Sequence, residues 1–470
     1  KSSDAGDTWV LQSNSPNILG RATDGTSTGG QSWYDLSLAV ATDNENELYV
    51  GGINLWRTTD GGQNWNINAS SGSGTSYTYM HVDQHAFEFN PHTHAAYAGN
   101  DGGIYKYMDN LNKWVDISDG LEISQFYKLG LSESNPNRLV AGAQDNGTEM
   151  LTNSTWDAIM GGDGMECMID HYDEDIIYAE YQYGGFEKSY NGGSNWNSIK
   201  PVNYDGGWVT PFKMHPLNNE LIVIGYEEVY RSETAGAIWD SISYNVSGGQ
   251  ALKTIALAAS DEDYIYASTY SKLKVTKDAG LTWTNIKYGL PNYSITDVTV
   301  ANNDADRVWA TLSGYEESHK IYESVDGGTN WVNITENGLP NLPVNCIVYQ
   351  AGANDDLYIG TDIGVYYKNN TMTDWIPFMT GLPNVVIKEL EIHYTKGTIS
   401  AATFGRGIWE SPLNALSTNI TEAKQVSFKI YPNPAEDKIT ISTNQKNIRV
   451  TIFNLTGVKV IETTKKTINT

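Results

Sequence analysis

The chain has 470 residues and a formal net charge of −26, the balance of 30 basic and 56 acidic side chains. Nucleic acid and anionic membrane surfaces both require clustered Lys and Arg, so this charge argues against either as a partner. Gly (45), Tyr (30) and Trp (14) are abundant and only 18% of the residues are charged, a composition typical of turn-rich β structure packed with aromatic rings. No stretch is apolar for long enough to predict a transmembrane helix.

A short pattern, Ser/Thr-x-Asp-x-Gly-x-Thr/Asn-Trp, recurs along most of the chain, and its fullest copy is residues 324–331. The Asp carboxylate accepts hydrogen bonds from nearby backbone N–H groups, and the Gly adopts the positive φ of a tight turn. The Trp begins the next strand, where we expect its ring to be buried between neighbouring sheets. Each copy therefore predicts a hairpin. Complete or worn copies end at Trp9, Trp65, Trp114, Trp196, Trp239, Trp283, Trp331 and Trp375.

The spacing of these tryptophans, together with Trp156, gives units of roughly 40 to 56 residues, which fits one four-stranded blade of a β-propeller. We therefore predict an all-β fold over residues 1–411, with about eight to nine blades visible, as a single propeller or as part of a tandem propeller. Because Lys1 begins inside a hairpin, we expect upstream sequence. Residues 401–410 read as a closing strand pair whose missing outer strand the Trp9 or Trp65 strand would supply.

These turns resemble the Asp-box (bacterial neuraminidase) repeats of sialidases, of xyloglucan-hydrolysing tandem propellers and of sortilin-type ten-bladed domains. The resemblance covers nearly all of residues 1–411 and implies a propeller. It says little about activity, because Asp-boxes lie on the face opposite the ligand site in those families, and a fold of this kind hosts many activities.

The composition changes after residue 411. Residues 412–424 read as a polar linker, and residues 425–470 alternate apolar and polar positions like a small β-sandwich. Their opening, Tyr431-Pro-Asn-Pro-Ala435, resembles the type A C-terminal sorting domain of the type IX secretion system of Bacteroidetes-like bacteria. The resemblance implies a protein that is secreted or displayed on the outer cell surface, with the secretion machinery as a partner. The family's closing strands are absent, so we expect this domain to be incomplete.

The two cysteines, Cys167 and Cys346, lie in apolar, strand-like stretches. Buried free thiols are the favoured interpretation. A disulfide between them would require contact across blades, which the sequence does not address.

The candidate site is predicted from blade topology. In a propeller, the turns between the second and third strands and the connections between blades gather at one mouth, and polar groups converging there are the usual start of a site. The first kind of turn holds Asp101, Asp145 and Asp362. The connections or the starts of the inner strands hold Trp33, Tyr34, His81, Asp83, His85, Asp163 and Glu166, and Gln144 precedes Asp145.

Three roles follow for these residues. Asp362, in Thr-Asp-Ile-Gly, resembles the stretch that holds the catalytic base of the xyloglucan-hydrolysing propellers. No segment matches the general-acid motif of that family, and Asp101, Asp145 and Asp163 stand as possible acids by position only. The alternative is that these carboxylates cap turns.

The ligand-binding candidates are Trp33, Tyr34, Gln144 and Asp163. Sugar rings could stack on the aromatic faces, and the hydroxyl groups of the sugar could form hydrogen bonds with the polar side chains.

His81, Asp83 and His85 follow one another with period 2, so on an extended segment all three side chains would project from one face. Two imidazoles and a carboxylate suit a divalent transition metal such as zinc. The alternative is a polar ladder that stabilises a long loop. No cofactor other than this metal is suggested.

The sequence thus favours a secreted or surface binding module for a glycan or a protein. The first alternative is a glycoside hydrolase of the xyloglucanase-like tandem-propeller type, and the second is a structural scaffold. The sequence leaves open whether the chain is an enzyme.

Overall fold

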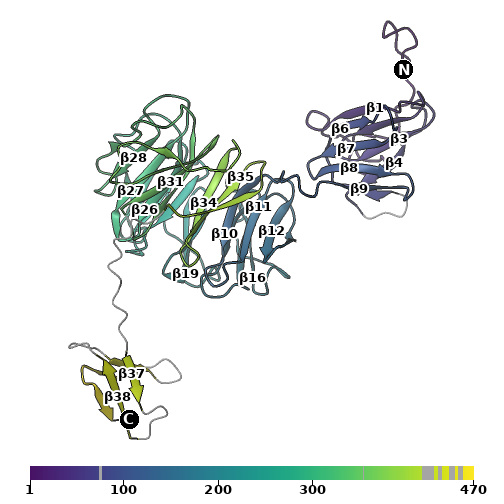
Figure 1. Ribbon diagram of the computed structural model, residues 1–470. Coiled ribbons are helices and arrows are strands. Elements are labelled where there is room, and N and C mark those ends of the chain that lie inside the picture. The colour runs from purple at the N-terminus through teal and green to yellow at the C-terminus, as the bar shows by residue number, and fades with distance from the viewer. Residues whose placement is uncertain are drawn as a thin grey trace. The chain divides into compact units, whose positions relative to one another are not determined.

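The computed structural model describes residues 1–72, 77–352, 354–414, 428–431, 437–443, 450–453 and 459–469. These residues form strands, turns and loops, as the all-β prediction requires (Figure 1). No helix with the length and apolar character to span a membrane occurs among them. The chain divides into two compact units, Lys1–Ser411 and Pro412–Thr470.

Two small sheets open the first unit and pack on each other. Tyr49 and Leu55 of the first sheet share a core with Phe87, Tyr105 and Trp114 of the second. We call these two sheets the N-terminal pair. The first consists of β1 (Ser37–Val40), β2 (Leu48–Gly51), β3 (Leu55–Thr58), β4 (Asn66–Ser70) and β5 (Thr78–Tyr79); the second consists of β6 (Gln84–Phe89), β7 (Ala96–Asn100), β8 (Gly103–Met108) and β9 (Lys113–Asp116).

Seven further sheets follow one another around a common centre and form a closed propeller, which we call the ring (Figure 1). Their strands run in sequence order from the centre outwards and are antiparallel. The first four sheets are β10 (Phe126–Leu131), β11 (Arg138–Ala143), β12 (Gly147–Thr152) and β13 (Thr155–Met160); β14 (Gly164–Ile169), β15 (Ile177–Tyr181), β16 (Gly185–Ser189) and β17 (Asn197–Ser198); β18 (Phe212–His215), β19 (Asn218–Gly225), β20 (Val229–Ser232) and β21 (Asp240–Ser241); β22 (Thr254–Leu257), β23 (Ile265–Ser268), β24 (Leu273–Thr276) and β25 (Thr284–Asn285).

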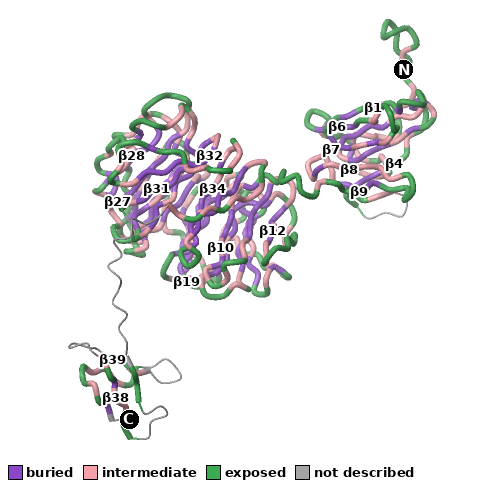
Figure 2. Tube along the Cα trace, viewed as in Figure 1, coloured by how far each residue is buried: buried purple, intermediate pink, exposed green. Residues whose placement is uncertain are grey.

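The last three sheets complete the ring. They are β26 (Ile295–Ala301), β27 (Asp304–Leu312), β28 (Ile321–Ser324) and β29 (Val332–Asn333); β30 (Val344–Gln350), β31 (Asp356–Thr361), β32 (Gly364–Lys368) and β33 (Ile376–Pro377); β34 (Ile387–His393), β35 (Thr398–Thr403) and β36 (Ile408–Pro412). Figure 2 shows that burial concentrates along the inner strands, while the turns are exposed.

The ring closes directly between its first and last inner strands. Glu389 of β34 accepts a hydrogen bond from the Leu129 backbone N–H of β10 at 2.7 Å and pairs with Lys128 Nζ at 3.0 Å. An isolated bridge between Gln125 and Phe404 continues the contact. The predicted closure by the Trp9 or Trp65 strand is therefore wrong. Trp65 directly precedes β4, which pairs within the first sheet, and the side chain of Trp9 is 75% exposed.

The repeated turn forms as its residue types require. In residues 324–331, the Ser324 hydroxyl donates to Asp326 Oδ1 and accepts from the Gly328 backbone N–H, while Asp326 Oδ1 also accepts from the Asn330 backbone N–H at 2.8 Å. Gly327 and Gly328 adopt φ of 69° and 86°. The turn joins β28 to β29, the two outer strands of the sheet. The same bonding recurs at Thr276 and Asp278.

Four of the tryptophans that end these turns connect neighbouring sheets of the ring. The indole N–H of each donates to a backbone carbonyl three residues beyond the equivalent Trp of the preceding sheet, so each of these bonds spans two blades. The buried Nε1 of Trp239 has no hydrogen-bond partner among the described residues. The predicted burial of these tryptophans is complete for Trp375 (1% exposed) and Trp114 (3%), and it is wrong for Trp9 (75%). The remaining tryptophans of the turns are partly buried. The bonds are Trp196 to Ile159, Trp283 to Ile242 and Trp331 to Ile286, each 2.8 Å, and Trp375 to Ile334, 3.0 Å.

The second unit is also built of strands: β37 (Phe428–Tyr431), β38 (Lys438–Thr443), β39 (Val450–Phe453), β40 (Lys459–Thr463) and β41 (Thr467–Asn469). β38 lies between β37 and β41, and β39 pairs with β40. Most of the predicted linker, 412–424, and most of the Tyr431–Ala435 motif lie outside the described residues.

Candidate functional site

The predicted site residues occupy the kinds of turn that the blade topology predicts. Asp101 lies between β7 and β8, Asp145 between β11 and β12, and Asp362 between β31 and β32. Asp163 directly precedes β14, and Trp33 and Tyr34 precede β1. Asp101, Asp145 and Asp362 therefore lie in short turns between neighbouring strands.

Asp101 connects Tyr34 and His85. Its Oδ2 accepts a hydrogen bond from the Tyr34 hydroxyl at 2.8 Å, and its Oδ1 lies 2.7 Å from His85 Nε2. The Tyr34 ring packs edge-on against the His85 imidazole with 4.9 Å between centroids. Trp33 lies beside Tyr34, with 5.9 Å between their ring centroids, and its side chain is 86% exposed. An exposed indole thus stands next to a tyrosine that a carboxylate holds in place.

Asp163, in the connection from the first to the second sheet of the ring, organises the second part of the site. Its Oδ1 accepts from the Asp145 backbone N–H at 2.8 Å and from Gln144 Nε2 at 3.1 Å. The Tyr127 hydroxyl in turn donates to Gln144 Oε1. At Asp163 the carboxylate therefore caps a turn, which is the alternative role considered for these residues.

Two hydrogen bonds join these parts. His81 Nε2 lies 3.1 Å from the Asp145 backbone carbonyl, and Asn146 Nδ2 donates to the Asp101 backbone carbonyl at 3.2 Å. The N-terminal pair and the first sheet of the ring thus contribute to one group of polar side chains. We call this group the mouth cluster: Tyr34, His81, His85, Asp101, Gln144, Asp145 and Asp163.

Burial and mutual repulsion raise the proton affinity of the acids here. Burial is the main reason that the pKa of Asp83 rises to about 7, helped by its hydrogen bond with Asp35 and by the charges of Asp35, Asp101 and Asp145. The pKa of Asp145 rises to about 6, again mainly through burial, with Asp101 and Asp163 adding to it. Burial and Asp101 also raise the pKa of Tyr34. Asp145 is therefore poised to hold or release a proton near neutral pH.

The predicted metal triad does not form. Asp83 adopts a φ of 64°, so residues 81–85 are not one extended segment and their side chains do not share a face. His81 and His85 have the separate partners described above, and Asp83 accepts a hydrogen bond from Gln31 instead. Among the described residues, no group of three His, Cys, Asp or Glu side chains is arranged to hold a metal ion.

Asp362 stands apart from the mouth cluster. It lies in the sixth sheet of the ring, and its Oδ1 accepts from Asn345 Nδ2 at 3.0 Å. No hydrogen bond or ion pair of the described residues links it to Asp101 or Asp145. Cys167 and Cys346 are both free and buried, as predicted.

The sequence pointed to Glu166 but not to the buried charge network that it joins on the inner strands of the ring. Lys128, Lys213, Glu166 and Glu389 form a network in which each lysine contacts both glutamates at 3.0 to 3.6 Å. The available signal was the presence of charged residues within apolar strands, as in the alternation of residues 387–392 (Ile-Lys-Glu-Leu-Glu-Ile).

Comparison with known proteins identifies the tail. Residues 429–470 match the family described as secretion system C-terminal sorting domain. The protein is therefore exported by type IX secretion to the cell surface or the extracellular space, and the tail implies interaction with the secretion machinery. No curated protein matches this chain.

Solved structures resemble the propeller part. An ancestral GH74 enzyme has a TM-score of 0.50 at 14% identity, over 62% of this chain and 45% of its own, so this chain spans less than half of that enzyme. The GH74 enzyme of Niastella koreensis has a TM-score of 0.35 at 16% identity, over 80% and 74% of the two chains. YCF48 bound to D1 peptide has a TM-score of 0.38 at 12% identity, over 81% and 94%. The first likeness supports the fold alone: fold and tail define a β-propeller protein that carries a secretion sorting domain.

Proposed function

We propose that this chain is a secreted or surface-displayed propeller that binds a glycan at the mouth cluster and the adjoining Trp33. The observation that carries the proposal is the exposed Trp33 ring beside Tyr34, whose hydroxyl Asp101 holds. Sugar rings stack on such aromatic faces through their C–H groups, while carboxylates and amides bond to their hydroxyl groups. We further propose that the repeated turns are Asp-boxes, which support the sheets and take no part in binding.

Affinity electrophoresis against a panel of plant and bacterial polysaccharides tests this proposal. Trp33→Ala should weaken the retardation of the protein by its ligand about tenfold or more, a loss of about 1.4 kcal/mol. Trp9→Ala is the matched control, because Trp9 is also exposed but has no carboxylate-held tyrosine beside it. Equal loss in both variants, or no retardation by any polysaccharide, would contradict glycan binding and favour a protein ligand or a scaffold.

The raised pKa of Asp145 favours a second candidate, glycoside hydrolysis. A glycosidase needs one carboxylic acid that is protonated near its working pH and a second carboxylate as base or nucleophile. Asp145 would be the acid, and Asp362 or Asp101 the second carboxylate. Reducing ends assayed on the same samples separate the candidates: turnover that Asp145→Asn or Asp362→Asn abolishes would establish the hydrolase, whereas retention without turnover supports the binding module.

A further inference from the structure

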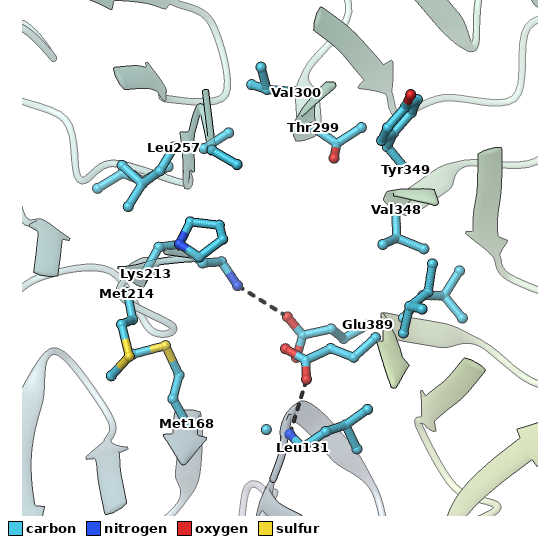
Figure 3. Close-up of a pocket in the computed structure, with 18 of the residues that line it drawn as sticks. Leu131, Met168, Lys213, Met214, Leu257, Thr299, Val300, Val348, Tyr349 and Glu389 are labelled. Atoms are coloured by element: carbon cyan, nitrogen blue, oxygen red, sulfur yellow. Dashed lines mark hydrogen bonds and ion pairs between the residues drawn. The ribbon is translucent and has the colours of Figure 1, made fainter. Parts of the chain in front are cut away.

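A cavity of about 620 Å³ runs through the centre of the ring, within the size range of small-molecule sites (Figure 3). All seven inner strands contribute to its wall. No residue of the mouth cluster lines it, so it is a separate place in the molecule. We call it the channel.

Most charged groups of the channel wall have partners among the described residues; the acid Glu133 and the cation Lys253 do not. Lys128 and Lys213 contact Glu166 and Glu389, and Figure 3 shows the bond from Lys213 to Glu389. Asp297 is engaged as well. Its Oδ1 accepts from the Thr254 hydroxyl and the Val298 backbone N–H, and its Oδ2 accepts from the Ile347 backbone N–H.

Lys253 is the lysine of the channel wall without a partner, and it lies next to β22. Its ammonium group enters no ion pair or side-chain hydrogen bond among the described residues. It lies over the Tyr270 ring, 5.8 Å from the ring centroid, in a cation–π contact. Lys253 is partly buried, and a cation that is partly withdrawn from water without a partner is unfavourable. Desolvation accordingly lowers the pKa of Lys253. An anion from outside the chain would supply the missing partner.

Apolar side chains form another part of the channel wall. Met168, Met214, Leu257, Val300 and Val348 come from five different sheets and surround the open centre in Figure 3. We call these five residues the apolar sleeve. Burial of apolar ligand surface contributes about 25 cal/mol per Å², and flexible methionines adapt to ligand shape. The sleeve therefore favours a ligand with an apolar body over a small inorganic anion.

Glu391 adds little repulsion toward an anion. Burial, and then the neighbouring charge of Glu389, raise the pKa of Glu391 to about 8, so this group is mostly protonated at neutral pH. Its Oε2 accepts from the Leu131 backbone N–H, a bond visible in Figure 3.

We propose that the channel is a second binding site, which takes a carboxylate with an apolar body, such as a medium-chain alkyl carboxylate. The carboxylate lies at Lys253 and the alkyl chain lies along the apolar sleeve. This site is independent of glycan binding at the mouth cluster.

Isothermal titration of the full chain with decanoate tests the proposal. We expect one molecule bound per chain, with Lys253→Met weakening the affinity about tenfold or more. Lys274→Met is the matched control, because Lys274 lies in β24 of the same sheet and does not line the channel. Absence of binding at about 1 mM decanoate, or equal weakening in both variants, would overturn the proposal.

Two other ligands and two more variants test the cationic end and the apolar sleeve of the site separately. 1-Decanol and decylamine should bind at least tenfold more weakly than decanoate, and equal binding of all three would overturn the role of Lys253. If Lys253→Met does not fold, Lys253→Arg should fold and retain decanoate binding. Val348→Phe should fill the sleeve and weaken decanoate binding, while glycan retardation at the mouth stays unchanged; full decanoate binding in this variant would place the ligand elsewhere.

Discussion

The ring and the N-terminal pair are built from the same repeat but differ in how their sheets are covered. In the ring, β34 packs on β10, so the last sheet covers the first. In the N-terminal pair, the second sheet covers one face of the first, while Leu38 and Val40 of β1 and the preceding Leu36 are 64%, 46% and 56% exposed. The comparison teaches that an alternating apolar pattern does not by itself bury the apolar side chains of a blade, because their burial requires a neighbouring sheet.

The tryptophans of the repeated turn show the same contrast. Trp375 is 1% exposed and bonds to the Ile334 carbonyl of the preceding sheet. Trp9 ends an equally well-formed turn but bonds only to Gly6 within that turn and is 75% exposed. The turn therefore positions the indole side chain of its Trp, and a neighbouring sheet is needed to cover that side chain.

Breaking the closure of the ring should have the largest effect. Glu389→Ala would leave Lys128 and Lys213 with an excess of buried positive charge and the Leu129 N–H without its acceptor, so we expect a loss of about 3–5 kcal/mol in the free energy of unfolding. Urea unfolding and hydrogen exchange of the β10 and β34 amides measure it. In the N-terminal pair, Glu47→Ala removes the more exposed pair with Arg57 and should cost about 1 kcal/mol or less. Equal costs would show that closure does not depend on Glu389.

Two glycines with the same backbone conformation separate packing from backbone strain. Gly328 in the ring and Gly29 before the N-terminal pair have φ of 86° and 87°. A Cβ at Gly328 would lie 2.5 Å from Ile286 Cδ1 of the preceding sheet, whereas nothing lies within 4 Å of one at Gly29. Gly29→Ala should cost about 1–2 kcal/mol from the positive φ alone, and Gly328→Ala about 1–3 kcal/mol more from overpacking. Thermal unfolding measures both, and equal shifts would exclude the packing effect.

The response to pH should differ in sign between the two regions. The folded-state pKa of Asp83 is raised to about 7, so folding retains a proton that the unfolded chain releases near pH 4. The stability that Asp83 contributes is therefore present below about pH 4 and is lost as the pH rises through about 7. Hydrogen exchange of the β6 amides should accelerate between about pH 4 and pH 7 in the wild type, and it should accelerate less in Asp83→Asn.

The ring provides the opposite case for comparison. Hydrogen bonds from the Asn330 side chain and backbone lower the pKa of Asp326, so its contribution is present above the usual Asp pKa of 3.8 and is lost on acidification through the lowered value. Hydrogen exchange of the β28 and β29 amides should accelerate below that range in the wild type and not in Asp326→Asn. The same sign of pH response at Asp83 and Asp326 would contradict these assignments.

Much of the fold was predictable because its signals are local. An Asp, a Gly and a Trp within eight residues are sufficient for the turn at 324–331, since the bonds of Ser324 and Asp326 that shape it lie within the turn itself. The seven-sheet closure was not predictable in the same way, because the repeat is the same in the ring and in the N-terminal pair. The ring differs from the N-terminal pair because its last inner strand, β34, packs on its first inner strand, β10.

For the candidate site, the sequence alone determined which residues occupy the turns at the ends of strands, and the tail alone determined export. Only the tertiary structure decided which of those residues meet: Tyr34 reaches Asp101 across 67 positions, and Lys128 reaches Glu389 across 261. It also separated His81, Asp83 and His85, because the positive φ of Asp83 interrupts the extended segment that their period-2 spacing suggested. Contacts between distant blades depend on how sheets pack around a centre, and no short stretch of sequence carries that information.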